Sequence, residues 1–116
     1  MTEPRFEIRL HKAAAKEYDK LDHSVVLQVD KALAELETRA DEIGKSLGKK
    51  RNVNLTGCKE IKLRDAGIRI VFLVAKEQVF VLQVVFVLAI DERDDDYVFR
   101  LAGKRYEDMK PSLKTE

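Results

Sequence analysis

Residues 59–72 read KEIKLRDAGIRIVF and decide the fold. From Lys59 to Arg64 apolar and polar residues alternate, so the apolar ones share one face, as in a half-buried β-strand. The segment 65–67 (Asp-Ala-Gly) predicts a tight turn, because glycine readily adopts the positive φ that such turns need. Residues 68–74 predict a returning strand. The whole stretch therefore predicts an antiparallel hairpin.

A third strand is expected on the C-terminal side of the hairpin. Residues 75–78 (Ala-Lys-Glu-Gln) predict a turn, and Val79–Ile90 predicts a long strand rich in Val and Phe. Short turns between successive strands allow only antiparallel pairing, so the three strands are expected to form a meander. The apolar run is well short of the roughly 20 residues that span a bilayer. We therefore expect no membrane partner.

The N-terminal part predicts one strand and two helices. Phe6–Leu10 alternates apolar and charged residues, which is the pattern of a strand. From Lys12 onward, alanines and larger apolar residues recur at helical spacing and predict a helix. The segment 22–24 (Asp-His-Ser) predicts a break with an N-cap, after which a second helix presents one apolar stripe. These patterns predict a helical hairpin.

The connecting and terminal segments complete the predicted fold. Gly44–Gly57 is basic and punctuated by glycine, and it predicts a loop. The acidic run Asp91–Asp96 fits the N-terminus of a short helix over Tyr97–Tyr106, because the helix dipole stabilises carboxylates there. The polar segment 107–116 contains a proline and predicts a frayed tail. The sequence thus predicts an α+β fold in the order β-α-α-β-β-β-α, with a single domain over residues 1–106 and a tail over residues 107–116.

Length and composition are those of one ordinary globular domain. The chain has 116 residues, 45% hydrophobic and 37% charged, which is enough to build one hydrophobic core. Its single cysteine, Cys58, cannot form an internal disulfide and is expected to be a small core residue. With no pattern of a signal peptide, this favours a reducing, cytoplasmic location.

Charge is distributed unevenly along the chain. The formal net charge is only +1, but residues 44–69 contain eight basic and two acidic residues, a local charge of +6 that leaves about −5 for the rest. The basic residues of this window are Lys45, Lys49, Lys50, Arg51, Lys59, Lys62, Arg64 and Arg69. Such a window indicates either a local site for a polyanion or a solvated charged face.

Several common catalytic motifs are missing from the sequence. It contains no glycine-rich phosphate loop, no HExxH and no Cys/His cluster at metal-ligand spacing, so we expect neither a metal nor a cofactor. His11 and His23 are expected to have surface or capping roles.

What remains is a set of cations on the predicted sheet. Lys62 and Arg64 share a strand face, Arg69 lies across the turn, and Arg93 follows the last strand. Cations in this arrangement are suited to bind a phosphodiester and to stabilise the charge of a phosphorane. Polar strand faces, however, often carry Lys and Arg merely to stay solvated, so the spacing alone is a weak argument for catalysis.

Several segments resemble RelE-type toxins of the RelE/ParE superfamily. Residues 55–64 (LTGCKEIKLR) and 66–72 (AGIRIVF) resemble the family's central hairpin. Residues 85–93 (VFVLAIDER) resemble its last long strand and the exit from it, and residues 102–105 (AGKR) resemble the end of its final helix. The order of these elements agrees with the family over roughly residues 6–106.

The resemblance implies an activity and a set of site residues. RelE toxins are ribosome-dependent endoribonucleases that cleave mRNA without a metal and leave a 2′,3′-cyclic phosphate. By position, Lys62 matches a catalytic lysine, Arg69 the arginine that stabilises the transition state, and Arg93 the arginine at the strand exit, which contacts phosphate or protonates the leaving oxygen. We expect further RNA contacts from the residues Lys50, Arg51, Lys59, Arg64 and Phe99.

The chain departs from the family pattern at three of these positions. Glu60 replaces a second catalytic lysine, Phe99 replaces a tyrosine that stacks on the mRNA base, and Glu92 replaces a lysine. Phenylalanine keeps a stacking surface but lacks the hydroxyl. For Glu60 three interpretations are open: a general base for the 2′-hydroxyl, a partner in a salt bridge, or the mark of a non-catalytic relative.

Two further hypotheses about function accompany the endoribonuclease. One is a ParE-like inhibitor of DNA gyrase, and the other is a non-catalytic relative that still binds an antitoxin. The resemblance also implies partners: a cognate antitoxin protein, the ribosome and mRNA, and operator DNA only indirectly through the antitoxin.

Overall fold

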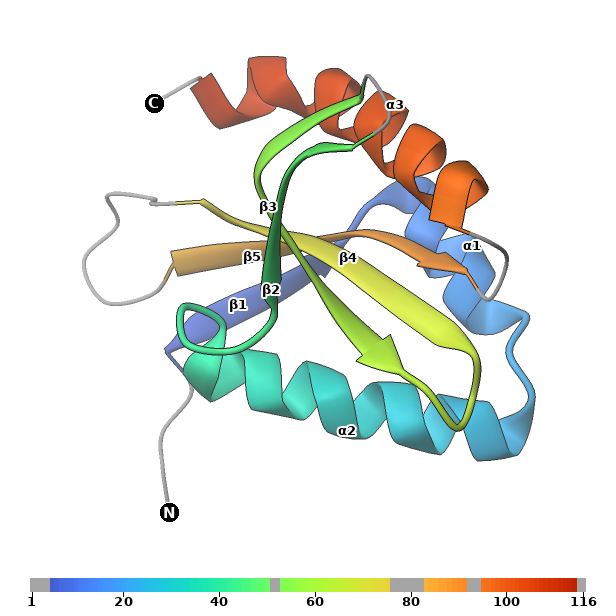
Figure 1. Ribbon diagram of the computed structural model, residues 1–116. Helices are drawn as coiled ribbons and strands as arrows, with labels where there is room; N and C mark the ends of the chain where they lie inside the picture. Colours follow the sequence, from blue (N-terminus) through green and yellow to red (C-terminus); the bar gives the residue numbers. More distant parts are fainter. Residues whose placement is uncertain (1–4, 51–52, 76–82, 92–94, 115–116) are drawn as a thin grey trace.

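The computed structural model describes residues 5–50, 53–75, 83–91 and 95–114, and it confirms the predicted α+β class (Figure 1). The elements in chain order are β1 (Phe6–Leu10), α1 (Lys12–Asp19), α2 (His23–Arg39), β2 (Lys45–Lys50), β3 (Val53–Leu63), β4 (Ile68–Ala75), β5 (Gln83–Asp91) and α3 (Asp95–Lys114). The meander predicted from the sequence is β3-β4-β5, and α1 and α2 form the predicted helical hairpin. Most of the turn predicted over residues 75–78 and the first four residues of the strand predicted over Val79–Ile90 lie outside the described residues.

The described strands form one sheet of five in the order β1-β5-β4-β3-β2. Only the β1–β5 pair among them is parallel, and the other three pairs are antiparallel. The β3–β4 hairpin places Lys62 directly opposite Arg69. A parallel pair needs a long crossover, and here the whole chain between β1 and β5 provides it.

Helices cover both faces of this sheet (Figure 1). On one side, called the α2 face, Val29 of α2 packs against Ile68 and Ile70 of β4. On the other side, called the α3 face, Phe99 and Ala102 of α3 share a buried cluster with residues of β2, β3 and β4. Alternate residues of one strand therefore belong to two different cores.

The predicted loop over Gly44–Gly57 is wrong in its larger part, because β2 and the first half of β3 lie there. β2 reads KSLGKK, and Leu47 is its buried apolar residue. So polar a strand at a sheet edge has almost no period-two pattern to reveal it. A register shift between Ser46 and Gly48 interrupts its pairing further.

The C-terminal helix is longer than predicted. We expected a helix over Tyr97–Tyr106 and a tail after it, whereas α3 begins at Asp95 and continues to Lys114. Residues 107–114 are therefore helical, and Pro111 lies within the helix rather than beyond its end. In the described part of the chain, no helix has the length and apolar character needed to cross a membrane.

Candidate functional site

The two faces of the sheet separate the charged residues of β3. Glu60 and Lys62 have the same orientation as Cys58, which is buried beneath α3. Lys59 has the orientation of Ile61, which packs on the α2 face. Lys62, Arg64 and Arg69 thus come together at the turn end of the β3–β4 hairpin, while Lys59 is separated from them.

Glu60 and Arg69 form a partly buried ion pair on the α3 face. Arg69 Nη1 donates to Glu60 Oε1 at 3.2 Å, and the two side chains are 19% and 4% exposed. The pair is diagonal: Glu60 lies two residues before Lys62, which is the register partner of Arg69. Of the three interpretations of Glu60, this contact favours the salt bridge.

Phe99 lies below the same arginine. The Arg69 Cζ atom is 5.8 Å from the centre of the Phe99 ring, which is a cation–π distance. The ring is only 6% exposed and belongs to the core under α3. A base needs an open ring face to stack on, so this placement is at odds with the expectation that Phe99 is a stacking platform.

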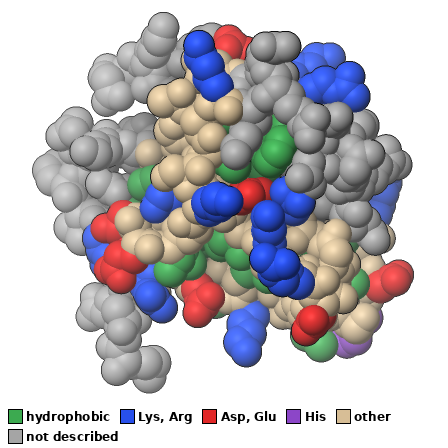
Figure 2. All heavy atoms as spheres, viewed as in Figure 1, with side chains coloured by type: hydrophobic (Ala, Val, Ile, Leu, Met, Phe, Trp, Pro, Cys, Tyr) green, Lys and Arg blue, Asp and Glu red, His purple; other side chains and the backbone are tan. Residues whose placement is uncertain are grey.

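A shallow hollow opens beside this pair. It has a volume of about 340 Å³ and is lined by Lys62, Leu63, Arg64, Gly67, Ile68 and Arg69. Lys62 and Arg64 are exposed, and within the described residues neither forms an ion pair. Figure 2 shows Lys and Arg side chains gathered near the middle of the view around a small acidic area. The hollow can accept an anion.

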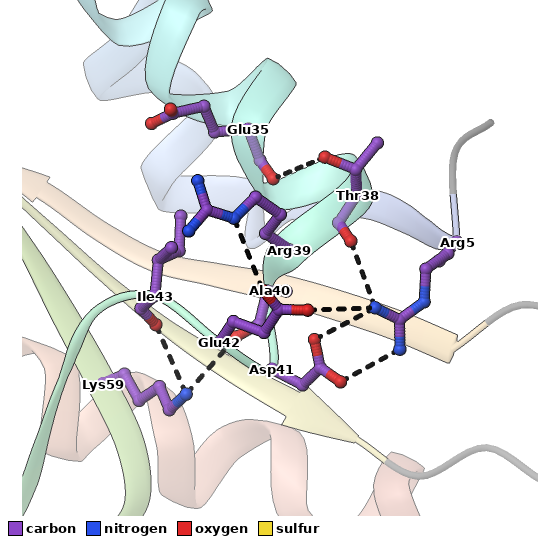
Figure 3. A network of polar contacts seen from close by, with 9 residues as sticks. All are labelled: Arg5, Glu35, Thr38, Arg39, Ala40, Asp41, Glu42, Ile43 and Lys59. Carbon is purple, nitrogen blue, oxygen red and sulfur yellow. Dashed lines mark hydrogen bonds and ion pairs between the residues drawn. The ribbon is translucent and has the colours of Figure 1, made fainter. Parts of the chain in front are cut away.

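Lys59, which we expected to contact RNA, is part of a different network (Figure 3). Its Nζ donates to the backbone carbonyls of Ala40 at 3.4 Å and of Ile43 at 3.3 Å. A cation at the C-terminal end of a helix satisfies carbonyls that have no partner within the helix. Lys59 therefore stabilises the end of α2.

The other end of that network ties β1 to α2. Arg5 donates to both carboxylate oxygens of Asp41, at 3.3 and 2.9 Å, and to the backbone carbonyl of Thr38 at 3.2 Å (Figure 3). This hydrogen bonding by Arg5 lowers the pKa of Asp41.

The remaining candidates lie away from the hollow or outside the described residues. Arg51 and Arg93 fall outside them, and of Lys50 the structure describes only its place at the end of β2. β5 ends at Asp91, whose backbone is the register partner of Arg69. His11 is the N-cap of α1, as expected for a capping role, and His23 is exposed at the start of α2.

One prominent contact was not foreseen from the sequence. Arg105 of α3 donates from two nitrogens to the two carboxylate oxygens of Glu17 in α1, both at 2.9 Å. The Arg105 side chain is 8% exposed and that of Glu17 is 22% exposed. Residues 88 apart in sequence give no local signal for such a pair. In the described part of the chain, no group of three His, Cys, Asp or Glu residues is arranged to hold a metal ion.

Comparison with known proteins finds relatives among the RelE toxins. The mRNA interferase toxin RelE of Escherichia coli K12 is 38% identical over 93 residues, which cover 79% of this chain and 87% of that protein. The chain belongs to the RelE family of toxins. No protein-family model matches it.

Solved RelE structures share the fold. A double arginine-to-alanine mutant of E. coli RelE in the free state aligns with a TM-score of 0.63 and 31% identity, over 88% of this chain and 97% of that one. A chain of the intact E. coli RelBE toxin–antitoxin complex aligns with a TM-score of 0.58 and 30% identity, over 78% and 99%.

Proposed function

We propose that this RelE-family chain is the toxin of a type II toxin–antitoxin system and an endoribonuclease that cleaves mRNA without a metal. The observation that carries the proposal is the hollow at the turn of the β3–β4 hairpin, which Lys62, Arg64 and Arg69 line together. Three cations around one hollow form a site for a phosphodiester. The relative that is 38% identical is an mRNA interferase, which supports this use of the site.

In the proposed reaction the ribose 2′-oxygen attacks the adjacent phosphorus and gives up its proton. The bond from phosphorus to the 5′-oxygen of the next nucleotide breaks, and that oxygen takes up a proton. The product is a 2′,3′-cyclic phosphate. Lys62 and Arg69 stabilise the negative charge that builds up on the phosphorane, because cations fixed in advance bind this charge more strongly than water does. Arg93, which follows β5 in the sequence, is proposed to contact the phosphate or the leaving oxygen.

The proposed partners follow from the same family relation. One structural neighbour is a toxin–antitoxin complex, which supports a cognate antitoxin for this chain. We further propose that the mRNA is cleaved on the ribosome, that operator DNA is reached only through the antitoxin, and that the protein acts in the cytoplasm.

A non-catalytic relative that still binds an antitoxin is the second candidate. The observation that favours it is the carboxylate of Glu60, which is 4% exposed and bound to Arg69. A negative charge at that place repels a phosphate and occupies the arginine. The two candidates therefore differ in whether Arg69 becomes available to RNA.

Induced expression of the wild type and of Lys62→Ala and Arg69→Ala variants tests the proposal. Growth, bulk translation and new mRNA 5′ ends are followed together, with Lys16→Ala, an exposed lysine of α1, as the control. We expect growth arrest and new 5′ ends within translated codons for the wild type and the control, and loss of both in the two site variants. Growth arrest without RNA cleavage, or a harmless wild type, contradicts the proposal.

A further inference from the structure

Glu60 is one of two charged residues that are buried in the described part of the chain, the other being Arg105. A buried carboxylate is costly unless a cation and hydrogen bonds compensate it. For Glu60 the compensating cation is Arg69, whose Nη1 lies 3.2 Å from Glu60 Oε1. Since Arg69 is also the cation proposed to bind the scissile phosphate, the pair connects the core of the protein to its site.

A guanidinium group binds a carboxylate and a phosphate through the same donors and in the same geometry. Nη1 of Arg69 is directed at Glu60, and Phe99 lies beside the guanidinium at 5.8 Å from Cζ. Glu60 and Phe99 thus fix the position of the arginine. The carboxylate also occupies a donor that a phosphodiester would use.

We propose that Glu60 is a positioning residue that holds Arg69 and competes with the RNA phosphate for it. This inference rests on the proposed function and adds to it a determinant of RNA affinity. The phosphate first contacts the exposed Lys62 and Arg64 beside the hollow, and Arg69 then exchanges the carboxylate for the phosphate. Because the exchange must occur for full binding, the apparent affinity is lower than the cations alone would give.

The decisive variant is Glu60→Gln, which keeps the shape of the side chain and removes its charge. The control is Asp65→Asn, which makes the same change of charge at an exposed position in the turn of the same hairpin. The probe is a fluorescent single-stranded RNA with 2′-O-methyl groups, which cannot be cleaved. Its dissociation constant is measured by anisotropy at several salt concentrations.

We expect Glu60→Gln to bind this RNA about tenfold more tightly than the wild type. This is the gain expected if the Glu60 carboxylate leaves Arg69 available to RNA in only about a tenth of the wild-type molecules. The control should change the affinity by less than about twofold, because an exposed charge is well screened. Because Arg69 contacts the phosphate in the bound state of both proteins, their log–log salt slopes should agree, whereas one additional phosphate contact in the variant would steepen the slope by about 0.7. A purely structural role of Glu60 would leave the RNA affinity unchanged or weaken it.

A measurement on the wild type covers the case in which the variant folds poorly. Inorganic phosphate is titrated into labelled protein, and the NMR signals of the Arg69 guanidinium and the Glu60 carboxyl carbon are followed. Competition requires both signals to shift with the same midpoint. A shift of Arg69 with an unchanged Glu60 signal overturns the inference.

The remaining outcomes separate this inference from the proposed function. If Arg69→Ala abolishes RNA cleavage and Glu60→Gln leaves RNA affinity unchanged, the inference fails and the function stands. If Glu60→Gln abolishes cleavage at unchanged affinity, Glu60 is a general base and the inference is wrong. If the wild type neither binds this RNA nor produces new mRNA 5′ ends in the expression test, the proposed function fails and the inference with it.

Discussion

In β3, neighbouring side chains have opposite roles because they point to opposite faces. Lys59 binds the end of α2, Glu60 binds Arg69, and Lys62 borders the hollow. The two lysines are equivalent in charge, and only the alternation of the strand separates them. That alternation was visible in the sequence, since Lys59 and Ile61 are two residues apart and therefore point to the same face. It predicts the role of Lys59 better than the position of this lysine in the basic segment 44–69 does. What the sequence could not show is that Phe99 is covered, because this depends on how α3 packs.

A single glycine fixes how the chain enters β2. Gly44 has a φ of +92°, and a Cβ atom there would lie 2.8 Å from Cζ of Phe72, a ring that is fully buried. Gly44→Ala should therefore cost the strain of positive φ, about 1–2 kcal/mol, and a further 1–3 kcal/mol or so of overpacking.

Gly48 provides a matched control for this prediction. Its φ is +66°, and a Cβ atom there would meet nothing within 4 Å. Gly48→Ala should show only the strain of positive φ. Urea unfolding of both variants measures the difference in free energy of unfolding, and equal losses would contradict the clash with Phe72.

At the scale of the element, α1 is held by contacts at its start and near its end. His11 caps its N-terminus: Nδ1 accepts from the backbone N–H of Ala13 at 3.0 Å. Burial lowers the pKa of His11 from its ordinary value of 6.5, and the charge of Arg105 lowers it further. Near its C-terminal end, Glu17 binds Arg105 of α3.

We expect acid to destabilise the protein through His11. The neutral imidazole is favoured in the folded state, so its contribution to stability is complete above pH 6.5 and is lost as the pH falls through the lowered folded pKa. Protonation also removes the acceptor of the cap. His11→Asn keeps a good N-cap without a titrating group. The loss of unfolding free energy between about pH 7.5 and about pH 5, the range over which histidine titrates, should therefore be smaller in this variant than in the wild type.

The second histidine is the control for this pH profile. His23 is exposed at the first residue of α2, and His23→Asn makes the same substitution outside the cap of α1. An unchanged profile in His11→Asn would show that the acid sensitivity arises elsewhere. Lys12, Glu17, Arg105 and Asp108 are the charged groups that act on His11, so both variants are compared at one ionic strength.

The pair of Glu17 and Arg105 joins α1 to α3, and its removal should loosen α3. Arg105→Ala leaves the partly buried carboxylate of Glu17 without this partner, and we expect a loss of about 2–3 kcal/mol, below the 3–5 kcal/mol of a fully buried pair. Arg100→Ala, at an exposed position on the same helix, should cost less than about 0.5 kcal/mol. Hydrogen exchange of α3 amides checks the result, and equal protection in the two variants would contradict it.

The elements differ in how well the sequence predicted them. The turn of the β3–β4 hairpin was predicted to within a few residues. In the sequence, a strand of alternating apolar and polar residues, a glycine turn and a second such strand follow one another directly. β2 was missed because its partner β3 supplies its pairing and its own residues carry almost no pattern. The length of α3 was missed because a proline near a polar end normally indicates a helix stop.

For the whole molecule, the sheet separates the core of the α2 face from the cations of the proposed RNA site. The α2 face holds Val29, Ile68 and Ile70 in a closed core. The hollow and the Glu60–Arg69 pair lie toward the end of the hairpin and the α3 face. The overall charge of +1 does not reveal this division. Among the basic residues of the segment 44–69, Lys59 has a structural role, whereas Lys62 is exposed beside the hollow.

Two lysines of one strand make that division measurable. Lys59→Ala removes two hydrogen bonds to the end of α2 and should lower the free energy of unfolding by about 1–2 kcal/mol, while RNA affinity stays within about twofold. Lys62→Ala removes an exposed cation beside the hollow, so unfolding should change by less than about 0.5 kcal/mol and RNA binding should weaken at least about fivefold. Urea unfolding and RNA anisotropy are measured on both variants. If Lys59→Ala weakens RNA binding as strongly as Lys62→Ala, the basic residues of the segment 44–69 act as one electrostatic surface. RNA binding would then not be confined to the cations on one face of the sheet.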